Sequence, residues 1–567
     1  MKAYSEPSTD FPIDLRQIYR GAADAWRDKV FIRENRNGSR YSYTFGKLAD
    51  DVDALGTALR ARGWTDKKIL LMGENCYAWV VSYLAIVCGL GTVVPVDREA
   101  SERELAHIAA FAEASAVLCS DACAARIHSA ELVLDTVRFS DLPALIREGN
   151  RSIINGDRTY LDAVIDPDAM HMLLFTSGTA RSPKGVMLSH RNICFNLSQI
   201  CDAIRVTDQD TFLSVLPLHH VYECTCGLFF PLFCGATVAF GDGMRQLTRS
   251  MQDFQPTVML CWPLLVDLLH QKLRLRIQQL GLQRRVARGI RLSSTLPTRA
   301  MRAAARRRSL SAVHELLGGK LRLVISGGAA ANPDALRGLR ELGICAYQGY
   351  GLTECAPLVA LNRENRYKDD SAGLPTSGAL FDVHDMREDG IGEIRYKGGN
   401  IMLGYYKDPA LTAKTIRDGW FYTGDLGYID EDGFLFITGR KKDVIVTASG
   451  KSVFPEELEN ALNRTPFVKE SVVVGCFNPR KQDHDVVAVI VPDRARFIEQ
   501  YGSTASDERL DLELRRAISD VNTSLHPYKH VKTYLLRARE IPRNSLQKIK
   551  RAEIIGEARA EYGKRFL

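Results

Sequence analysis

The chain lacks the features of a secretory signal at its start. Its first twenty residues carry acidic side chains at Glu6, Asp10 and Asp14, and they contain no continuous apolar core. A signal peptide needs a basic start followed by such a core. We therefore expect that this segment does not direct secretion.

The chain also lacks a convincing membrane span. Cys76–Val96 is uncharged over 21 residues, which is long enough to cross a bilayer. However, Gly89, Gly91 and Pro95 interrupt the segment, and its last five residues, Thr-Val-Val-Pro-Val, are typical of a strand. A buried helix followed by a buried strand is the better interpretation.

The thirteen cysteines lack the pattern of a disulfide framework. Their number is odd, the chain is long, and many lie in apolar runs, as Cys88, Cys119 and Cys476 do. Cys224 and Cys226 form a C-x-C pair, but no second Cys or His pair follows at zinc spacing. These features favour buried thiols in a cytoplasmic protein.

Acidic residues are absent from one basic segment. Residues 271–310 contain twelve Lys or Arg and no Asp or Glu, whereas the whole chain has a formal net charge of +7. The rest of the chain is therefore net acidic, which argues against a general affinity for nucleic acid. A charged helical face is usually just solvated. As a hypothesis, twelve cations could also hold the protein peripherally at the inner, anionic surface of a membrane.

The order of apolar segments predicts an α/β fold with more than one domain. A chain of 567 residues is too long for one ordinary core. Residues 15–35 and 45–62 have helical spacing, and short β-rich runs then alternate with helices, as in a parallel sheet. The predicted strands are Lys68–Met72, Thr92–Val96, Ala116–Ser120, Leu132–Asp135, Thr211–Val215, Thr237–Phe240, Thr257–Leu260, Leu321–Ser326 and Cys345–Gly349.

The pattern changes near Gly392 to short strands with Asp-Gly turns. This predicts a β-rich subdomain over about residues 380–440. A charged link follows at Arg440–Asp443, and the residues beyond it suffice for a small, mobile α+β domain. We therefore predict a large domain over residues 1–440 and a small one over residues 441–567. The elements predicted in the small domain are a helix near Pro455–Arg464, strands near Val468–Gly475 and Val486–Val491, and a helix near Leu510–Leu525.

The segment Thr176–Gly185 has the composition of a phosphate-binding loop. It follows an apolar strand and reads Thr-Ser-Gly-Thr-Ala-Arg-Ser-Pro-Lys-Gly. Glycine lets backbone N–H groups approach an anion, while hydroxyls and Lys184 add donors and charge. The alternative is a Ser/Gly-rich surface loop. A Walker loop is excluded, because the only Gly-Lys-Ser, Gly450–Ser452, has Ile445 where the first glycine is required.

Five segments in register resemble the adenylate-forming superfamily, which includes acyl-CoA synthetases, adenylation domains of peptide synthetases and luciferases. The phosphate loop is the first of them. The others are Gly349–Glu354, Tyr422–Asp425, Gly439–Asp443 with Val453–Glu457, and Pro542–Ile549. The resemblance covers nearly the whole chain. It departs from the family pattern at Ala180-Arg181, where Thr-Gly is usual, and at Gln547, where Gly is usual.

The resemblance implies roles for particular residues. Tyr350 would stack on adenine, and Asp425 and Arg440 would contact the ribose. Glu354, with Thr176, would hold Mg²⁺, which prefers oxygen ligands. The full set implied in ATP or AMP binding is Thr176, Ser177, Gly178, Thr179, Lys184, Gly327, Gly328, Tyr350, Gly351, Thr353, Asp425 and Arg440.

The resemblance also implies two residues of the small domain. Lys548 would be the adenylation lysine, because a fixed ammonium stabilises the charge that develops on the phosphoryl group in the transition state. Lys442 matches the hinge about which the small domain turns between two half-reactions. With Glu354 and His220, Lys548 makes up the implied catalytic set.

Leu216–Tyr222 resembles the acyl-pocket segment of the family, in which His220 would lie by the substrate carboxylate. Two adjacent His residues could instead be partly exposed turn residues. The implied pocket residues are His220, Val221, Tyr222 and Trp262. They lie in apolar runs that could equally form core. No Asp stands where an amino group would be gripped, which argues against an amino-acid substrate.

The sequence of Gly318–Ala330 and the position of the basic segment resemble those of long-chain fatty acyl-CoA synthetases. This implies that ATP activates a medium- to long-chain fatty acid as acyl-AMP with release of pyrophosphate, and that coenzyme A then takes the acyl group. No carrier domain follows Lys548, so we expect a separate acceptor. The alternatives are a free-standing ligase that loads an acyl carrier protein, a coenzyme A ligase for another hydrophobic acid, and a non-catalytic acyl binder.

Overall fold

The computed structural model describes residues 11–36, 38–176, 184–447, 451–504, 506–544 and 547–566. The chain forms two compact units. The first comprises Met1–Phe381, Tyr396–Phe421 and Glu431–Leu435, and the second comprises Asp382–Arg395, Tyr422–Asp430 and Phe436–Leu567. Most strands of the predicted β-rich subdomain therefore group with the C-terminal residues, and a domain boundary at residue 440 stays a prediction.

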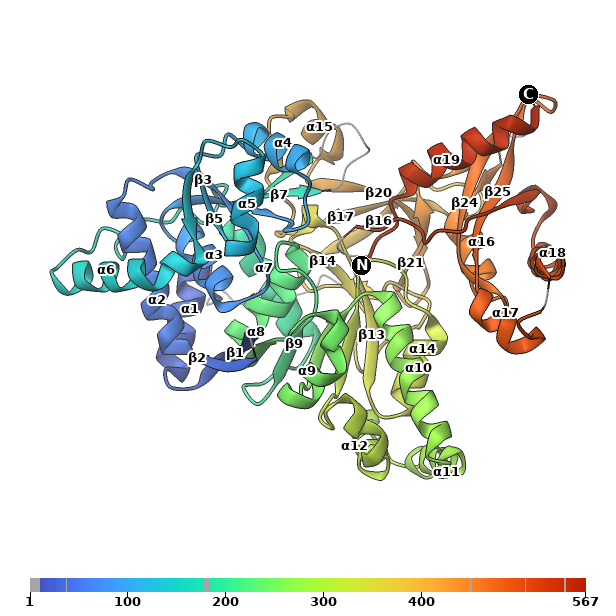
Figure 1. The fold of residues 1–567 in the computed structure, drawn as a ribbon, viewed down its shortest axis with the longest axis horizontal. Coiled ribbons are helices and arrows are strands. Elements are labelled where there is room, and N and C mark those ends of the chain that lie inside the picture. Colours follow the sequence, from blue (N-terminus) through green and yellow to red (C-terminus); the bar gives the residue numbers. More distant parts are fainter. Residues whose placement is uncertain are drawn as a thin grey trace. The chain divides into compact units, whose positions relative to one another are not determined.

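The first unit contains a nine-stranded sheet in the order β15-β14-β13-β12-β11-β9-β10-β1-β2 (Figure 1). Its central strands, from β13 to β1, run parallel, and antiparallel strands flank them at both edges. The strands are β1 (Val30–Arg36), β2 (Ser39–Thr44), β9 (Thr211–Ser214), β10 (Thr237–Phe240), β11 (Val258–Cys261), β12 (Leu323–Ser326), β13 (Cys345–Gly351), β14 (Leu358–Leu361) and β15 (Leu374–Pro375).

A seven-stranded sheet in the order β18-β8-β7-β4-β3-β5-β6 completes the first unit. The strands from β7 to β6 are parallel, whereas β8 is antiparallel to both of its neighbours, β7 and β18. The parallel α/β fold predicted from the alternating segments is confirmed. The strands are β3 (Lys67–Met72), β4 (Gly91–Val96), β5 (Ala116–Cys119), β6 (Asp135–Arg138), β7 (Met172–Thr176), β8 (Lys184–Leu188) and β18 (Gly404–Tyr405), with β19 (Ile416–Arg417) outside this sheet.

Helices of the first unit cover the two sheets. For example, α10 and α14 contact each other, and α10 also contacts β12 while α14 contacts β13 (Figure 1). Local sequence fixes several of their ends: Asp14 caps α1, and Ser101 and Glu104 form a reciprocal capping box on α4. The helices are α1 (Leu15–Trp26), α2 (Phe45–Ala61), α3 (Tyr77–Val87), α4 (Glu102–Ala112), α5 (Asp121–Ser129), α6 (Leu142–Ile154), α7 (His190–Ala203), the π-helix η2 (Tyr222–Phe229), α8 (Phe230–Phe233), α9 (Leu247–Phe254), α10 (Pro263–Gln279), α11 (Gln283–Ser293), α12 (Arg299–Ser309), α13 (Ser311–His314), α14 (Pro333–Glu341) and α15 (Pro409–Thr415).

The uncharged segment Cys76–Val96 forms α3 followed by β4, so its interpretation as a buried helix and a buried strand is confirmed. Each helix of the described ranges is too short or too polar to be a bilayer-crossing segment. The helix predicted over residues 15–35 is wrong in its second half, where β1 begins at Val30. Phe31 and Ile32 are fully buried there, and β1 pairs with both β2 and β10, so tertiary pairing overrides the helical spacing.

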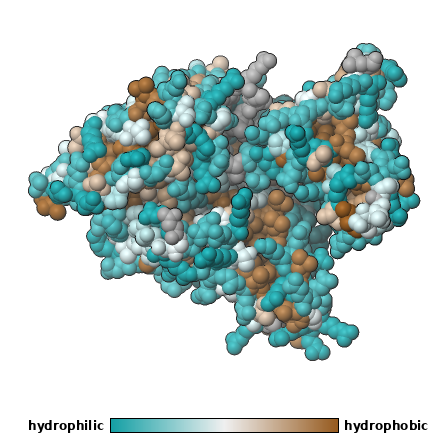
Figure 2. Space-filling model, viewed as in Figure 1, coloured by the Kyte–Doolittle hydropathy of each residue, from teal (hydrophilic) through white to brown (hydrophobic). Residues whose placement is uncertain are grey.

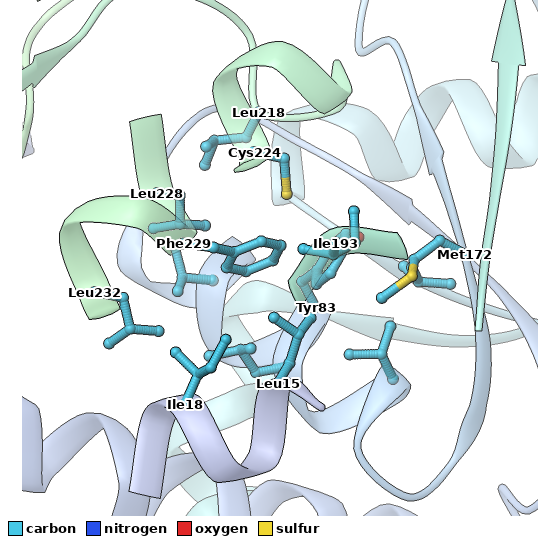
Figure 3. Close-up of a cluster of buried hydrophobic side chains, with 14 of the residues drawn as sticks. Leu15, Ile18, Tyr83, Met172, Ile193, Leu218, Cys224, Leu228, Phe229 and Leu232 are labelled. Carbon is cyan, nitrogen blue, oxygen red and sulfur yellow. The ribbon is translucent and has the colours of Figure 1, made fainter. Parts of the chain in front are cut away.

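The largest apolar cluster anchors η2, the helix that begins at Tyr222. Figure 3 shows Leu15 and Ile18 of α1 beside Phe229 and Leu232, with Tyr83 of α3 between them and Ile193. Leu15 and Phe229 have no exposed surface. Burial of a large side chain of this kind stabilises a fold by roughly 1.5–3 kcal/mol. The end of η2 is therefore held by helices from three other parts of the chain.

The second unit contains most residues of strands β16, β17, β20 and β21. It also contains two further sheets. β22 pairs with β23, and β24, β25 and β26 form a three-stranded sheet. The helices and strands predicted beyond residue 441 are all present, with ends that shift by a few residues. The elements are β16 (Leu380–His384), β17 (Gly392–Lys397), β20 (Trp420–Ile429), β21 (Leu435–Arg440), β22 (Ile445–Val446), β23 (Ser452–Val453), α16 (Pro455–Leu462), β24 (Val468–Asn478), β25 (Asp483–Pro492), α17 (Arg494–Tyr501), α18 (Asp507–Thr523), β26 (Thr533–Leu536) and α19 (Arg551–Gly563).

Candidate functional site

The two ends of the predicted phosphate loop lie opposite each other in a strand pair. Thr176 is the last residue of β7, Lys184 is the first of β8, and the two are register partners. Ser177, Gly178 and Thr179, together with Ala180-Arg181, lie outside the described residues. The hydroxyl of Thr176 and the ammonium of Lys184 thus flank the start and the end of one short connection.

A tyrosine that the sequence analysis missed joins two of the predicted site residues. The Tyr405 hydroxyl donates a hydrogen bond of 2.9 Å to Oε1 of Glu354. The Lys184 Nζ lies 5.0 Å from the centre of the Tyr405 ring, within the range of a cation–π contact. Tyr405 is only 5% exposed, so its position is fixed by packing. It reaches Lys184 because β18 pairs with β8.

Backbone geometry also holds Glu354 in place. Glu354 follows β13 and lies in a short turn, and its carbonyl accepts a hydrogen bond of 2.8 Å from the Met402 N–H. At Gly351 a Cβ atom would come within 2.4 Å of the Pro357 carbonyl oxygen, so only glycine fits the turn before Thr353. The half-buried carboxylate is therefore presented from a tightly constrained loop.

Gly327, Gly328 and Tyr350 follow or end neighbouring parallel strands, because β12 pairs with β13. Ligands in parallel α/β sheets commonly bind at this carboxyl edge. A Cβ atom on Gly327 would lie 2.8 Å from Cζ of the Tyr222 ring, so the glycine permits the ring to approach the backbone. The Tyr222 hydroxyl donates a 3.1 Å hydrogen bond to the carbonyl of Ile325.

Tyr222 also lines a small cavity whose walls are otherwise formed by apolar side chains and one thiol. The cavity lies between residues of β9, β11, β12 and β14 in the nine-stranded sheet and residues of η2. Val221 lines a second small cavity with His219, whereas Trp262 lines neither of these two cavities in the described part of the chain. The lining of the first cavity is Ile200, Ile204, Val206, Phe212, Tyr222, Cys226, Phe230, Val258, Leu260, Ile325, Leu358 and Leu361.

The first of the two adjacent histidines connects the two sheets of the first unit. His219 Nε2 lies 3.6 Å from Oδ2 of Asp97, which follows β4, and the His219 and His220 ring centres are 4.2 Å apart. Burial, opposed by the Asp97 carboxylate, lowers the pKa of His219 to about 4. His219 is therefore neutral at physiological pH. Asp97 was not predicted, although an acid directly after a buried parallel strand is a usable signal.

A buried acid beneath this segment was also missed. Glu223 is 1% exposed, and its carboxyl group bonds the Ser214 hydroxyl. Burial raises the pKa of Glu223 to about 8. Asn75 donates to the same Ser214 hydroxyl at 3.1 Å and to the Leu216 carbonyl at 2.7 Å, and it accepts from the Leu218 N–H at 3.0 Å. This network ties η2 to the loop that carries the histidines.

In the second unit the two predicted ribose contacts lie side by side. Arg440 Nε is 3.0 Å from Oδ1 of Asp425, whose side chain is 4% exposed while that of Arg440 is 48% exposed. Backbone bonds order the turn: the Asp425 N–H donates to the Thr423 hydroxyl at 3.1 Å, and the Lys441 N–H donates to the Gly424 carbonyl at 2.9 Å. A carboxylate so held is a fixed acceptor.

The predicted hinge and the predicted adenylation lysine belong to segments that share one ion cluster. Lys442 is exposed in a turn, and the next residue, Asp443, lies 3.9 Å from Arg551 at the start of α19. Arg551 also makes two 2.7 Å hydrogen bonds to Glu459. The cluster therefore links the hinge turn to the segment that contains Lys548.

Lys548 itself lies in a tight turn. Its N–H donates to Oδ1 of Asn544 at 2.9 Å, and the Asn544 N–H donates to the Lys548 carbonyl at 3.0 Å. Gln547, directly before it, has a φ of +59°, in the left-handed region that favours glycine. The side chain of Lys548 is exposed. The departure from glycine at this position thus places a bulkier residue in a glycine-like conformation.

Comparisons with known protein families and known proteins give matches that cover most of the chain. The sequence matches the AMP-binding enzyme family over residues 19–406 and the AMP-binding enzyme C-terminal domain over residues 442–562. It is 27% identical to the long-chain-fatty-acid–CoA ligase FadD15 of Mycobacterium bovis, over 80% of this chain and 78% of the relative. It is also 27% identical to the human long-chain-fatty-acid–CoA ligase 1, over 93% and 82%.

Other relatives carry different names. The chain is 24% identical to the chloroplastic long-chain-fatty-acid–[acyl-carrier-protein] ligase AEE15 of Arabidopsis thaliana, over 90% of this chain and 81% of the relative. Its fold is similar to that of the anthranilate CoA ligase AuaEII, with a TM-score of 0.76 at 19% identity over 98% and 99% of the two chains. ATP-bound MatB from Rhodopseudomonas palustris gives a TM-score of 0.75 at 24% identity over 96% and 99%. The family matches and the fold lead to one conclusion: the chain belongs to the AMP-binding enzymes, a family of adenylate-forming acid–thiol ligases.

Proposed function

We propose that this protein activates a medium- to long-chain fatty acid as acyl-AMP and then transfers the acyl group to coenzyme A. The observation that carries the substrate class is the position of Tyr222. Its ring approaches Gly327, an implied nucleotide-binding residue, and the same ring lines the apolar cavity. A nucleotide and a hydrophobic chain could thus meet at one side chain. The long-chain ligases among the relatives support the same substrate class.

In the first half-reaction, a carboxylate oxygen of the acid attacks the α-phosphorus of ATP. A new P–O bond forms, the bond to the bridging oxygen of pyrophosphate breaks, and pyrophosphate leaves with the bonding electrons. Lys548 would stabilise the negative charge that grows on the phosphoryl oxygens. Thr176 and Lys184 would hold the phosphates, and Asp425 would fix the ribose.

Magnesium fits the residues assigned to it. The Glu354 carboxylate and the Thr176 hydroxyl offer oxygen ligands, and Mg²⁺ commonly binds through one or two protein oxygens plus substrate phosphates and water. When bound, the ion would neutralise phosphate charge during transfer. The hydrogen bond from Tyr405 occupies one lone pair of Glu354 and orients its carboxylate.

In the second half-reaction, the sulfur of a thiol attacks the acyl carbon of acyl-AMP. The C–S bond forms, AMP leaves with the electrons of the acyl–oxygen bond, and the thiol proton goes to solvent or buffer. Coenzyme A is the proposed acceptor, because the long-chain relatives named as CoA ligases match well over most of the chain. The second candidate acceptor is an acyl carrier protein, which the relative from Arabidopsis thaliana favours.

The test is ATP–pyrophosphate exchange with saturated acids from acetate to octadecanoate. We expect a maximum at medium or long chains and a loss of roughly a hundredfold or more in the Lys548→Ala variant. Maximal exchange with acetate would contradict the substrate class, and full exchange by Lys548→Ala would contradict the role of the lysine. Mass spectrometry of the thioester formed from coenzyme A or from carrier protein would identify the acceptor.

A further inference from the structure

A long acid-free segment of the first unit lies at the molecular surface. Residues 268–314 contain no Asp or Glu and include all twelve cations of the basic segment. They form most of α10, together with α11, α12 and α13. No carboxylate of the described ranges lies within 4.0 Å of the cations on α10 and α11. These cations are Lys272, Arg274, Arg276, Arg284, Arg285, Arg288 and Arg291.

Apolar side chains are also exposed along α10, which begins just before this segment. On α10, Leu264 is 45%, Leu268 41% and Leu275 57% exposed, whereas Leu265 and Leu269 one position further along are 1% exposed. Since each residue turns a helix by about 100°, the three exposed leucines lie within about 40° of one another. They form one stripe, which we call the α10 stripe. Figure 2 shows hydrophobic side chains gathered over α10 on this face of the molecule.

Cations flank the α10 stripe on both sides. By the same rotation, Lys272 lies about 80° to one side of Leu264 and Arg274 about 80° to the other. Long basic side chains so placed can lay their methylenes along an apolar surface and keep their charge in a polar layer. Further apolar side chains are exposed past the end of α10, where Leu280 is 38% and Leu292 of α11 is 65% exposed.

We propose that the α10 stripe and the cations of α10 and α11 form a docking surface for an anionic lipid bilayer. An apolar stripe between basic side chains is the pattern of a helix that lies in a membrane interface. Charge complementarity selects the occupant. A second copy of the chain in a twofold contact would place cation against cation, and a nucleic acid would leave the leucines unpaired with apolar surface.

The proposal goes beyond the proposed ligase activity and rests on the surface residues alone. Membrane docking would nevertheless suit an enzyme with a hydrophobic substrate. Val258 and Leu260 of β11 line the apolar cavity, and β11 leads through Trp262 directly into α10. Trp262 packs against both large apolar clusters of this unit. The strand that borders the cavity and the helix that carries the stripe are thus consecutive, so docking would bring a lipid surface close to the acyl site.

The experiment is flotation of the full chain with vesicles of phosphatidylcholine alone and with phosphatidylcholine mixed equally with phosphatidylglycerol. We expect binding to the anionic vesicles at low salt, weaker binding at high salt, and little binding to phosphatidylcholine. The charge variant Arg284→Gln/Arg285→Gln/Arg288→Gln should bind at least about tenfold more weakly, because each basic residue near an anionic surface contributes about a fivefold factor before screening. The stripe variant Leu268→Ser/Leu275→Ser should also lose binding.

A matched control removes two exposed apolar side chains elsewhere. Ile498 and Leu512 are 48% and 49% exposed on α17 and α18, and Ile498→Ser/Leu512→Ser should bind vesicles as the wild type does. The proposal is overturned if the wild type does not float with anionic vesicles at low salt, or if the charge and stripe variants bind unchanged. A concentration-dependent dimer that the stripe variant abolishes, without vesicle binding, would also overturn it in favour of a second copy.

The outcome is separate from that of the ligase assay. Exchange with a water-soluble acid, such as octanoate, needs no vesicle, and none of the substituted residues belongs to the proposed site. Vesicle binding without any exchange would support the docking surface and refute the proposed function. Exchange without vesicle binding would support the proposed function and refute the docking surface.

Discussion

The hydroxyl of Tyr405 donates a hydrogen bond of 2.9 Å to Oε1 of Glu354, and the ring of the same tyrosine lies 5.0 Å from Nζ of Lys184. One buried side chain therefore contacts both the implied magnesium ligand and the implied phosphate lysine. Since Tyr405 is anchored by the pairing of β18 with β8, the orientation of Glu354 depends on a strand distant from it in sequence.

We expect the substitution Tyr405→Phe to slow adenylation by roughly tenfold to a hundredfold. A hydrogen bond to a charged group contributes about 1.5–3 kcal/mol, and about 1.4 kcal/mol corresponds to a factor of ten. The phenyl ring retains its packing and its contact with Lys184, so the fold should persist. ATP–pyrophosphate exchange measured against magnesium concentration would show the loss, with a raised magnesium requirement.

Tyr406→Phe provides the matched control for this prediction. The Tyr406 hydroxyl bonds the exposed Glu113 at 3.0 Å, so the same chemical change is made one residue away. We expect it to leave exchange unchanged. Equal exchange by wild type and Tyr405→Phe at limiting magnesium would show that the Tyr405 hydroxyl has no part in adenylation.

The pair Asp425–Arg440 predicts a specific nucleotide preference. If Asp425 accepts hydrogen bonds from the ribose diol, the wild type should use ATP better than 2′-deoxy-ATP. Asp425→Ala should raise the KM for ATP by roughly tenfold to a hundredfold, because bonds to a charged acceptor are lost. Asp425→Ala should also lower the ratio of kcat/KM for ATP to kcat/KM for 2′-deoxy-ATP. The KM for the fatty acid should stay unchanged.

Asp432→Ala is the control for the ribose assignment. Asp432 is 66% exposed and pairs with Lys368 at 2.7 Å, so its removal tests the loss of a surface acid alone. We expect wild-type kinetics with both nucleotides. An Asp425→Ala enzyme that still prefers ATP by the wild-type ratio would place the ribose contact elsewhere.

The sequence predicted best those features that are local. Strand–loop–helix order, the segment Cys76–Val96 and the small α+β region depend on short apolar patterns, which act within a few residues. The helix over residues 15–35 failed where β1 pairs with two strands, one of them about two hundred residues away. Long-range pairing of this kind leaves no local periodic signal.

The candidate site likewise contains residues that local sequence predicts and residues that only long-range packing brings together. Motif spacing predicted roles for Glu354, Asp425 and Arg440, and the last two do lie together. It could not identify Tyr405, whose hydrogen-bond partner Glu354 is 51 positions away, because their contact depends on tertiary packing, in which β18 also pairs with β8. Nor could it identify Glu223 as a buried acid, since its burial depends on the packing of η2 against other helices.

Glu223 predicts a pH dependence of stability. Burial raises its pKa in the folded protein to about 8, against about 4.3 for an unfolded chain. Between these values the native state holds a proton that the unfolded state releases. The contribution of Glu223 to the free energy of unfolding is therefore fully present below about pH 4.3 and is lost as pH rises towards about 8, by at most about 1.4 kcal/mol per pH unit.

Glu223→Gln removes this titration. We expect its Tm relative to the wild type to rise as pH increases from about 5 to about 8, whatever the constant offset caused by the amide. The neighbours Tyr222, Cys224, Cys226 and Cys261 have raised pKa values and stay neutral in that range. Glu499→Gln, at an exposed position, should run parallel to the wild type. Parallel profiles for Glu223→Gln would contradict a protonated Glu223.

The conformation of Gln547 gives the last prediction. Its φ of +59° costs a residue other than glycine roughly 1–2 kcal/mol, and a β-branched residue more. Its carbonyl accepts a 2.8 Å hydrogen bond from Arg543, and the next residue is Lys548. We expect Gln547→Gly to keep or raise the exchange rate, and Gln547→Val to lower it several-fold by distorting the turn. Thioester formation from supplied acyl-AMP should change less, because Lys548 is assigned to the adenylation step.

Gln482 offers a control in the same unit. It has a φ of +50° in the hairpin between β24 and β25, so Gln482→Val introduces the same strain far from Lys548 in sequence. Both valine variants should lower the Tm by a similar amount, since the strain depends on the backbone conformation alone. Only Gln547→Val should lower exchange more than thioester formation. If both variants reduce the two half-reactions equally, the turn acts through stability, and the orientation of Lys548 does not depend on residue 547.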